Sequence, residues 1–151
     1  LDRDKYRRQE VAVVYQAFHL FPLLTALENV TYPMELSGVK GKAAREKARH
    51  LLELVGLPQT IAEQFPKMMS GGEQQRVAIA RALASDAKVI LADEPTGNLD
   101  SENSQNIIDI LLRLAHEEGR CVVLITHDNE IAAQADRVFH LKDGRIVSGQ
   151  T

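Results

Sequence analysis

The chain has 151 residues, of which 44% are hydrophobic and 26% charged, and these proportions exclude a disordered tail, a collagen and a disulfide scaffold. Eighteen Lys and Arg against 21 Asp and Glu give a formal net charge of −3, which argues against binding to nucleic acid. One cysteine excludes an internal disulfide, and no apolar run approaches the roughly 20 residues of a membrane span.

Short apolar runs alternate with amphipathic segments along the chain. The runs predict strands at 11–15, 89–92 and 121–126, and a final hairpin of 138–141 and 145–147. The 3.6-residue spacing of apolar side chains predicts helices at 42–55, 71–84, 103–117 and 129–134. A further helix is expected to begin at Ala26, with Thr25 and Glu28 as a capping box, and to kink or end at Pro33.

This alternation indicates a parallel sheet covered on both faces, so the fold class is α/β. Residues 26–69 contain helices and no predicted strand, and we expect them to form a helical insertion.

Two carboxylates, Asp93 and Glu94, follow the apolar strand that begins at Val89. Open α/β sheets bind ligands at the carboxyl ends of their strands. Asp93 is placed to hold a metal ion through water, and Glu94 to orient or deprotonate an attacking water. A strand that simply ends in surface acids is the alternative, and this motif alone leaves it open.

Ser70, Gly71 and Gly72 open the helix predicted at 71–84. Glycines allow backbone N–H groups to approach a ligand, and a helix N-terminus attracts anions, so these residues form a candidate anion site. Ser70 as an ordinary N-cap is the alternative. Gln16 and His127 end two other apolar strands, and three polar strand ends beside a glycine-rich helix start favour a shared site.

In this order, the motifs resemble those of the nucleotide-binding domain of ABC transporters. The segment from Met69 to Glu73 is similar to the signature motif LSGGQ, with Met69 in place of leucine and Glu73 in place of glutamine. Other matches are 90–96 with the Walker B segment, 97–100 with the D-loop, Gln16 with the Q-loop and His127 with the switch histidine. The subgroup that serves macrolide-type exporters, lipoprotein release and some peptide-resistance systems has segments similar to residues 15–16, 18–22, 24–30 and 92–100.

The resemblance implies a P-loop NTPase-like parallel sheet with a helical subdomain. It implies three segments: core residues 1–25, a helical subdomain 26–84 and core residues 85–151. The phosphate loop, Gly-x-x-x-x-Gly-Lys-Ser/Thr, is absent, because Gly41-Lys42 is followed by Ala43 and Leu36 stands where the first glycine belongs. With no initiator methionine and no secretory signal at Leu1 to Lys5, we expect a piece of a longer protein whose N-terminal part is missing here.

The resemblance also implies roles for the strand-end residues in hydrolysing ATP. Asp93 would hold Mg²⁺ through water, and Gln16 would contact Mg²⁺ or the attacking water. Glu94 would be the general base or would polarise that water. His127 would contact the γ-phosphate and fix the geometry of Glu94.

A second nucleotide-binding domain, as a homodimer, is the implied partner, because two such domains sandwich two ATP molecules head to tail. Ser70, Gly71 and Gly72, with Glu73, would bind the γ-phosphate of the ATP held by the opposing subunit. Asp100 would line the junction between the two subunits.

The implied function is an ATPase subunit coupled to export or lipoprotein-type transport, cytoplasmic and peripheral on the inner face of the cell membrane. A transmembrane permease subunit would dock near Gln16 to Leu27, unless Phe18, Leu20 and Phe21 are ordinary core. We expect this chain alone to be inactive. The alternatives are a non-catalytic interaction fragment and an ABC-type ATPase of DNA repair or chromosome maintenance; the second carries long heptad stretches, which this sequence lacks.

Overall fold

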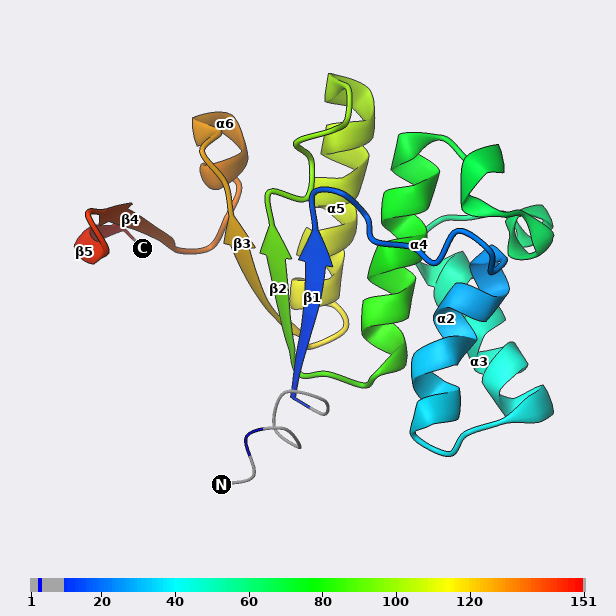
Figure 1. Cartoon of the computed structure of the whole chain (residues 1–151). Coiled ribbons are helices and arrows are strands. Elements are labelled where there is room, and N and C mark those ends of the chain that lie inside the picture. The colour runs from blue at the N-terminus through cyan, green and yellow to red at the C-terminus, as the bar shows by residue number, and fades with distance from the viewer. Residues whose placement is uncertain (1–2, 4–9, 151) are drawn as a thin grey trace.

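A parallel sheet organises the computed structural model, which describes residue 3 and residues 10–150 (Figure 1). Most of residues 1–9 of the first predicted segment therefore lie outside the described residues. In that part of the chain the sheet has the order β1 (Val11–Tyr15), β2 (Val89–Asp93) and β3 (Cys121–Ile125). Tyr15 pairs with Asp93, and Asp93 with Ile125, so the three strands end level with one another.

Helices fill the connections between these strands. They are α2 (Ala26–Leu36), α3 (Gly41–Leu54), α4 (Gly71–Ala84), α5 (Ser101–His116) and α6 (Asn129–Ala132), with 3₁₀ turns η1 (Gln59–Glu63) and η2 (Pro66–Met68). The first three helices pack on one another, while α4 also contacts β1 and α5 contacts β3 (Figure 1). Within the described ranges, no helix has the length and apolar character needed to cross a membrane.

Pro33 does not end α2, which excludes one of the two outcomes expected from the sequence, a kink or an end. Thr25 caps the helix by accepting a bond from the Glu28 N–H at 3.2 Å, and the helix continues to Leu36. Pro33 removes one intrahelical bond. The side chains of Val30 and Met34 flank it on the buried face of α2, so tertiary packing outweighs that lost bond.

One face of the sheet is covered, and the expectation of two covered faces is wrong for the described residues. Ala92 and Ile90 point into the hydrophobic core that the helices share. On the other face Val123 is 45% and Ile125 47% exposed. The helices that contact the sheet, α4 and α5, cover one face, so only every second side chain along each strand is packed against them.

The chain ends in the predicted hairpin, β4 (Val138–Lys142) and β5 (Arg145–Gln150). Asp143 and Gly144 both have positive φ, 51° and 73°, as a two-residue type I′ turn requires. Among the described residues β4 and β5 pair only with each other, so β3 is an edge strand of the three-stranded sheet, as β1 is on the other side.

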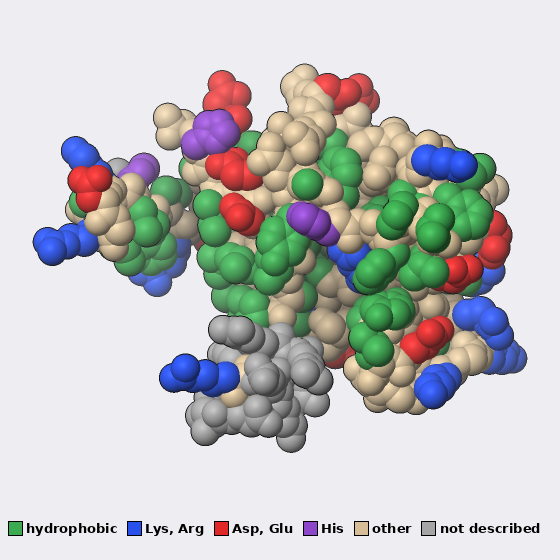
Figure 2. Space-filling view, viewed as in Figure 1, with side chains coloured by type: hydrophobic (Ala, Val, Ile, Leu, Met, Phe, Trp, Pro, Cys, Tyr) green, Lys and Arg blue, Asp and Glu red, His purple; other side chains and the backbone are tan. Residues whose placement is uncertain are grey.

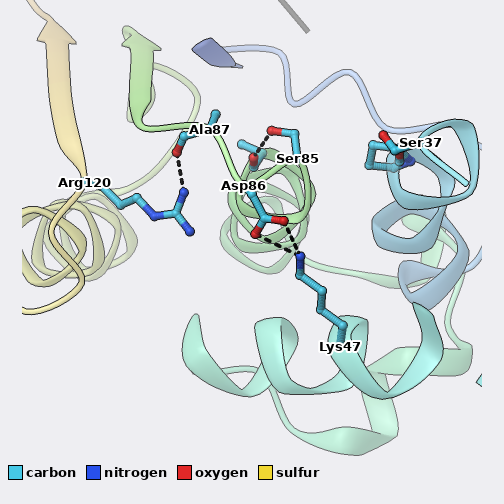
Figure 3. Close-up of polar contacts among 8 residues, drawn as sticks. Ser37, Lys47, Ser85, Asp86, Ala87 and Arg120 are labelled. Carbon is cyan, nitrogen blue, oxygen red and sulfur yellow. Dashed lines mark hydrogen bonds and ion pairs between the residues drawn. The ribbon is translucent and has the colours of Figure 1, made fainter. Parts of the chain in front are cut away.

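Polar contacts join the α2–α4 helices to the rest of the fold. Lys47 on α3 reaches Asp86, in the turn between α4 and β2, at 2.8 Å (Figure 3). Arg113 on α5 donates to the carbonyl of Leu54 at the end of α3 at 2.6 Å. Arg120 donates to the Ala87 carbonyl and ties the start of β3 to the start of β2 (Figure 3).

Candidate functional site

The three strands end level with one another, which brings the predicted residues that follow them to the carboxyl end of the sheet. Gln16 follows β1, Glu94 follows β2, and His127 lies two residues beyond β3. The Glu94 N–H donates to the Ile125 carbonyl at 2.9 Å and so extends the ladder by one bond past β2. Strand register therefore juxtaposes residues that lie up to 111 positions apart in the sequence, from Gln16 to His127.

Glu94 and His127 form a hydrogen-bonded pair. Oε1 of Glu94 accepts from the His127 backbone N–H at 3.1 Å and lies 2.8 Å from Nδ1 of the ring. Because the Glu94 carboxylate accepts, Nδ1 carries the proton in this pair, and Nε2 takes no part in it. Hydrogen bonding and then the charge of Glu94 raise the pKa of His127 above its ordinary value. Glu94 holds a left-handed φ of 45°, a conformation that non-glycine residues adopt at a cost.

Gln16 lies over Gly97 in the turn that follows Glu94. Its Nε2 donates to Oδ1 of Asn98 at 3.3 Å, and Asn98 returns a bond to the Gln16 carbonyl at 3.1 Å. A Cβ on Gly97 would stand 2.6 Å from Cδ of Gln16. An alanine at this position would therefore displace the exposed Gln16 amide from its place over the turn.

Asp93 ends β2 with an exposed side chain next to the end of β1. No three His, Cys, Asp or Glu side chains in the described part of the chain are grouped to hold a metal ion. Asp93 and Gln16 nevertheless offer hard oxygen ligands, and Mg²⁺ is often bound by one or two carboxylates together with substrate phosphates. The residues present fit a Mg²⁺–nucleotide complex and do not form a self-sufficient metal site.

Ser70 is the N-cap of α4 and forms a complete capping box with Glu73. Its Oγ accepts from the Glu73 N–H at 3.2 Å, and its own N–H donates to Oε1 of Glu73 at 2.9 Å. The ordinary N-cap interpretation thus describes what Ser70 does in this conformation. The Glu73 carboxylate occupies an N–H that an anion would otherwise use.

Gly72 is in close contact with α5. A Cβ there would collide with the Asn103 side-chain oxygen and lie 2.9 Å from its Cγ. Asn103 is itself held by Asp100, which caps α5 by accepting from the Asn103 N–H at 2.8 Å and from its Nδ2 at 3.0 Å. Gly72 and Asp100 therefore have a structural role, in joining the starts of α4 and α5, in addition to any role in ligand binding.

Two residues of α4 reach this site and were not predicted from the sequence. Gln75 donates to the carbonyls of Tyr15 and Pro95, and Arg81 donates to those of Phe18 and His19. A polar Gln75 on the buried side of an amphipathic helix was a usable signal. Arg81 carried none, because arginines are common on helices.

A family model described as ABC transporter matches residues 2–97, more than half of the chain. The chain belongs to the ABC transporter family. This confirms the resemblance drawn from the motifs.

Named relatives match nearly the whole chain. The lipoprotein-releasing system ATP-binding protein LolD of Hyphomonas neptunium is 46% identical over 96% of this chain and 63% of its own length. The macrolide export ATP-binding/permease protein MacB of Chlorobium phaeobacteroides is 51% identical over 95% of this chain and 22% of its own length. An uncharacterised ABC transporter ATP-binding protein of Mycobacterium tuberculosis is 47% identical over 97% of this chain. The chain spans 58% of the length of that relative.

A solved structure has the same fold. The ATP-binding cassette MJ0796 of Methanocaldococcus jannaschii, in a dimeric post-hydrolysis state bound to ADP and Pi, superposes with a TM-score of 0.85 at 42% identity. The match covers 99% of this chain and 67% of that one. The expected α/β fold of ABC ATPases is therefore confirmed.

Proposed function

We propose that this chain is part of an ATP-hydrolysing subunit of an ABC transporter, which couples hydrolysis to export or lipoprotein-type transport. The observation that carries the proposal is the Glu94–His127 pair, at 2.8 Å, with Gln16 and Asp93 at the same carboxyl end of the sheet. A general base that is oriented by a histidine beside a metal-binding carboxylate is an arrangement suited to hydrolysis of a phosphoanhydride. The relatives named for lipoprotein release and macrolide export support the transport assignment.

The side chains divide the work in this proposal. Both bonds from His127 use Oε1 of Glu94, which leaves Oε2 to take a proton from an attacking water. His127 keeps the carboxylate in place and directs Nε2 toward the γ-phosphate. Asp93 and Gln16 would hold Mg²⁺, which neutralises charge on the nucleotide when bound.

The partners are a second nucleotide-binding domain and a permease subunit. The start of α4 at Ser70 would bind the γ-phosphate of ATP held by the second domain. The dimeric state of the MJ0796 cassette, bound to ADP and Pi, supports a second domain as partner. Between β1 and α2 the chain exposes Leu23 by 86% and Phe21 by 43%, while Phe18 and Leu20 are half-buried. Figure 2 shows hydrophobic side chains gathered over this segment and α2. We place the permease contact there, and the subunit on the inner face of the membrane.

The test is phosphate release with and without a phosphate loop. The 151-residue chain has no such loop and is expected to release no phosphate from ATP. In a form of the protein that includes the loop, Glu94→Gln should stop turnover while ATP stays bound, whereas Glu117→Gln, an exposed matched control, should not. Normal turnover in Glu94→Gln would show that Glu94 is not the base. ATP binding without hydrolysis in the unsubstituted protein would favour the non-catalytic alternative.

A further inference from the structure

The buried side-chain amide of Gln75, on α4, hydrogen-bonds to the backbone beside two of the candidate site residues. Gln75 has no exposed surface, and its Nε2 donates to the Tyr15 carbonyl at 3.0 Å and to the Pro95 carbonyl at 2.6 Å. Tyr15 directly precedes Gln16, and Pro95 directly follows Glu94. A single nitrogen atom therefore bridges the backbone next to both residues.

The chemistry of the two acceptors requires an amide at this position. Both are carbonyl oxygens, so the side chain must present two N–H donors from one atom and must be neutral to be buried without a counter-charge. Asn and Gln are the side chains with that property, and Gln has the length to reach both strand ends from α4. Oε1 of Gln75 is buried without a hydrogen-bond partner among the described residues.

Arg81 holds the next part of the same loop. Its guanidinium donates to the His19 carbonyl at 2.7 Å and to the Phe18 carbonyl at 3.1 Å. Phe18 and His19 both have left-handed φ angles, 59° and 54°, which are unfavourable for residues with side chains. Such a pair persists when surrounding contacts hold it, and Arg81 supplies two of these contacts.

We propose that Gln75 and Arg81 are positioning residues through which α4, the helix that begins at the signature motif, sets the placement of Gln16 relative to Glu94. Figure 1 shows α4 alongside β1, with the loop that follows β1 crossing the helix. The consequence for hydrolysis rests on the proposed function. The placement itself does not, because it concerns backbone contacts within this chain.

Amide hydrogen exchange in the 151-residue chain tests the placement without nucleotide. The Phe18 N–H donates to the Tyr15 carbonyl and the Gly97 N–H to the Glu94 carbonyl, so these amides report on the two linked turns. In Gln75→Met both should exchange about tenfold faster, as expected when one hydrogen bond to each turn is lost. Amides inside α4, such as that of Ile79, should keep their rates.

Neighbouring residues on α4 provide the controls. The Gln74 amide donates to the Met69 carbonyl, and Arg76 donates to the Gly56 carbonyl; among the described residues neither side chain hydrogen-bonds to the loop after β1. Gln74→Met and Arg76→Met should leave exchange at Phe18 and Gly97 unchanged, whereas Arg81→Met should accelerate it at Phe18 and His19. Gln75→Asn keeps the amide but is one methylene too short to reach both carbonyls. It serves if Gln75→Met does not fold, and its expected exchange pattern is the same.

Hydrolysis supplies the second arm, in a form that includes a phosphate loop. Gln75→Met should lower kcat about tenfold and leave KM for ATP within twofold, because the hydrogen bonds of Gln75 go to the backbone beside Glu94 and Gln16. Wild-type exchange rates at Phe18 and Gly97 in a folded Gln75 variant would overturn the placement. Equal loss in kcat and rise in KM would overturn the positioning role. A protein that hydrolyses no ATP even without substitution would refute the proposed function and leave the exchange result standing.

Discussion

Replacing Gly72 by Ala tests whether the second signature glycine is required by packing. The added methyl would meet the side chain of Asn103, with 2.9 Å between the new Cβ and Cγ of Asn103 and 3.3 Å to its Cβ. Asn103 has little freedom to move, because two of its nitrogens are bonded to the Asp100 carboxylate at 2.8 and 3.0 Å. The substitution therefore either displaces Asn103 from its cap or separates the starts of α4 and α5.

The magnitude follows from two opposed effects. Alanine in place of glycine favours a helix by up to about 1 kcal/mol. Overpacking of a tight contact costs about 1 to 3 kcal/mol. We expect a net loss of about 1 to 2 kcal/mol in the free energy of unfolding, which for a chain of this length lowers Tm by about 2 to 8 °C.

Urea and thermal unfolding of Gly72→Ala, Asn103→Ala, the double variant and Gly71→Ala isolate the contact. In Gly72→Ala/Asn103→Ala the clash is gone, and the pair should show a coupling energy of at least about 1 kcal/mol. Gly71→Ala is the control, because its Cβ would stand 3.3 Å from Cδ2 of Leu99 and 3.5 Å from Cζ of Phe18, the far ends of side chains that can shift. A Gly72→Ala protein as stable as the wild type, or no recovery in the double variant, would refute the packing argument. In a form that includes a phosphate loop, a stable double variant that fails to form an ATP-dependent dimer, while Asn103→Ala still forms one, would add a ligand role for Gly72.

Three further predictions concern the carboxyl end of the sheet and its edge strand β3. His127 should titrate above its ordinary pKa of about 6.5 in an NMR titration, because Glu94 raises the pKa. The stability that this pair contributes is then fully present below pH 6.5 and is lost as the pH rises through the raised pKa. An unchanged His127 titration in Glu94→Gln would contradict the role of Glu94. Gly97→Ala should displace the exposed Gln16 side chain from Asn98 and cost about 0.5 to 1.5 kcal/mol, because its Cβ would stand 2.6 Å from Cδ of Gln16 and one hydrogen bond is lost. In a Gln16→Ala background the same substitution should cost nothing further, and equal stability of Gly97→Ala and wild type would refute the contact. Amides at 122–125 in the edge strand β3 should exchange faster than those at 89–91 in the central strand β2, and strong, equal protection of both strands in a monomer would show that the edge of β3 is covered.

Local patterns in the sequence were sufficient to predict most of the helices and strands and to nominate candidate site residues. The helix at 71–84 was predicted to the residue, and the Asp143-Gly144 turn was correct, because a serine cap, apolar periodicity and a two-residue turn act within a few positions of each other. Motif spacing along the chain was enough to recognise the family and to nominate Gln16, Glu94 and His127. Local sequence did not predict that α2 continues past Pro33, because burial of the neighbouring side chains in α2 stabilises the helix there.

Tertiary structure alone decided which of these residues touch and what supports them. The 2.8 Å contact of Glu94 with His127 depends on the level register of β2 and β3, which a linear pattern does not specify. The close contacts of Gly72 and Gly97 are with side chains from distant segments, Asn103 and Gln16. Gln75 bridges two carbonyls that are 80 residues apart in the sequence, those of Tyr15 and Pro95. Contacts of this kind arise only when separate elements pack, because sequence neighbours set a residue's backbone preference, whereas the fold sets its partners.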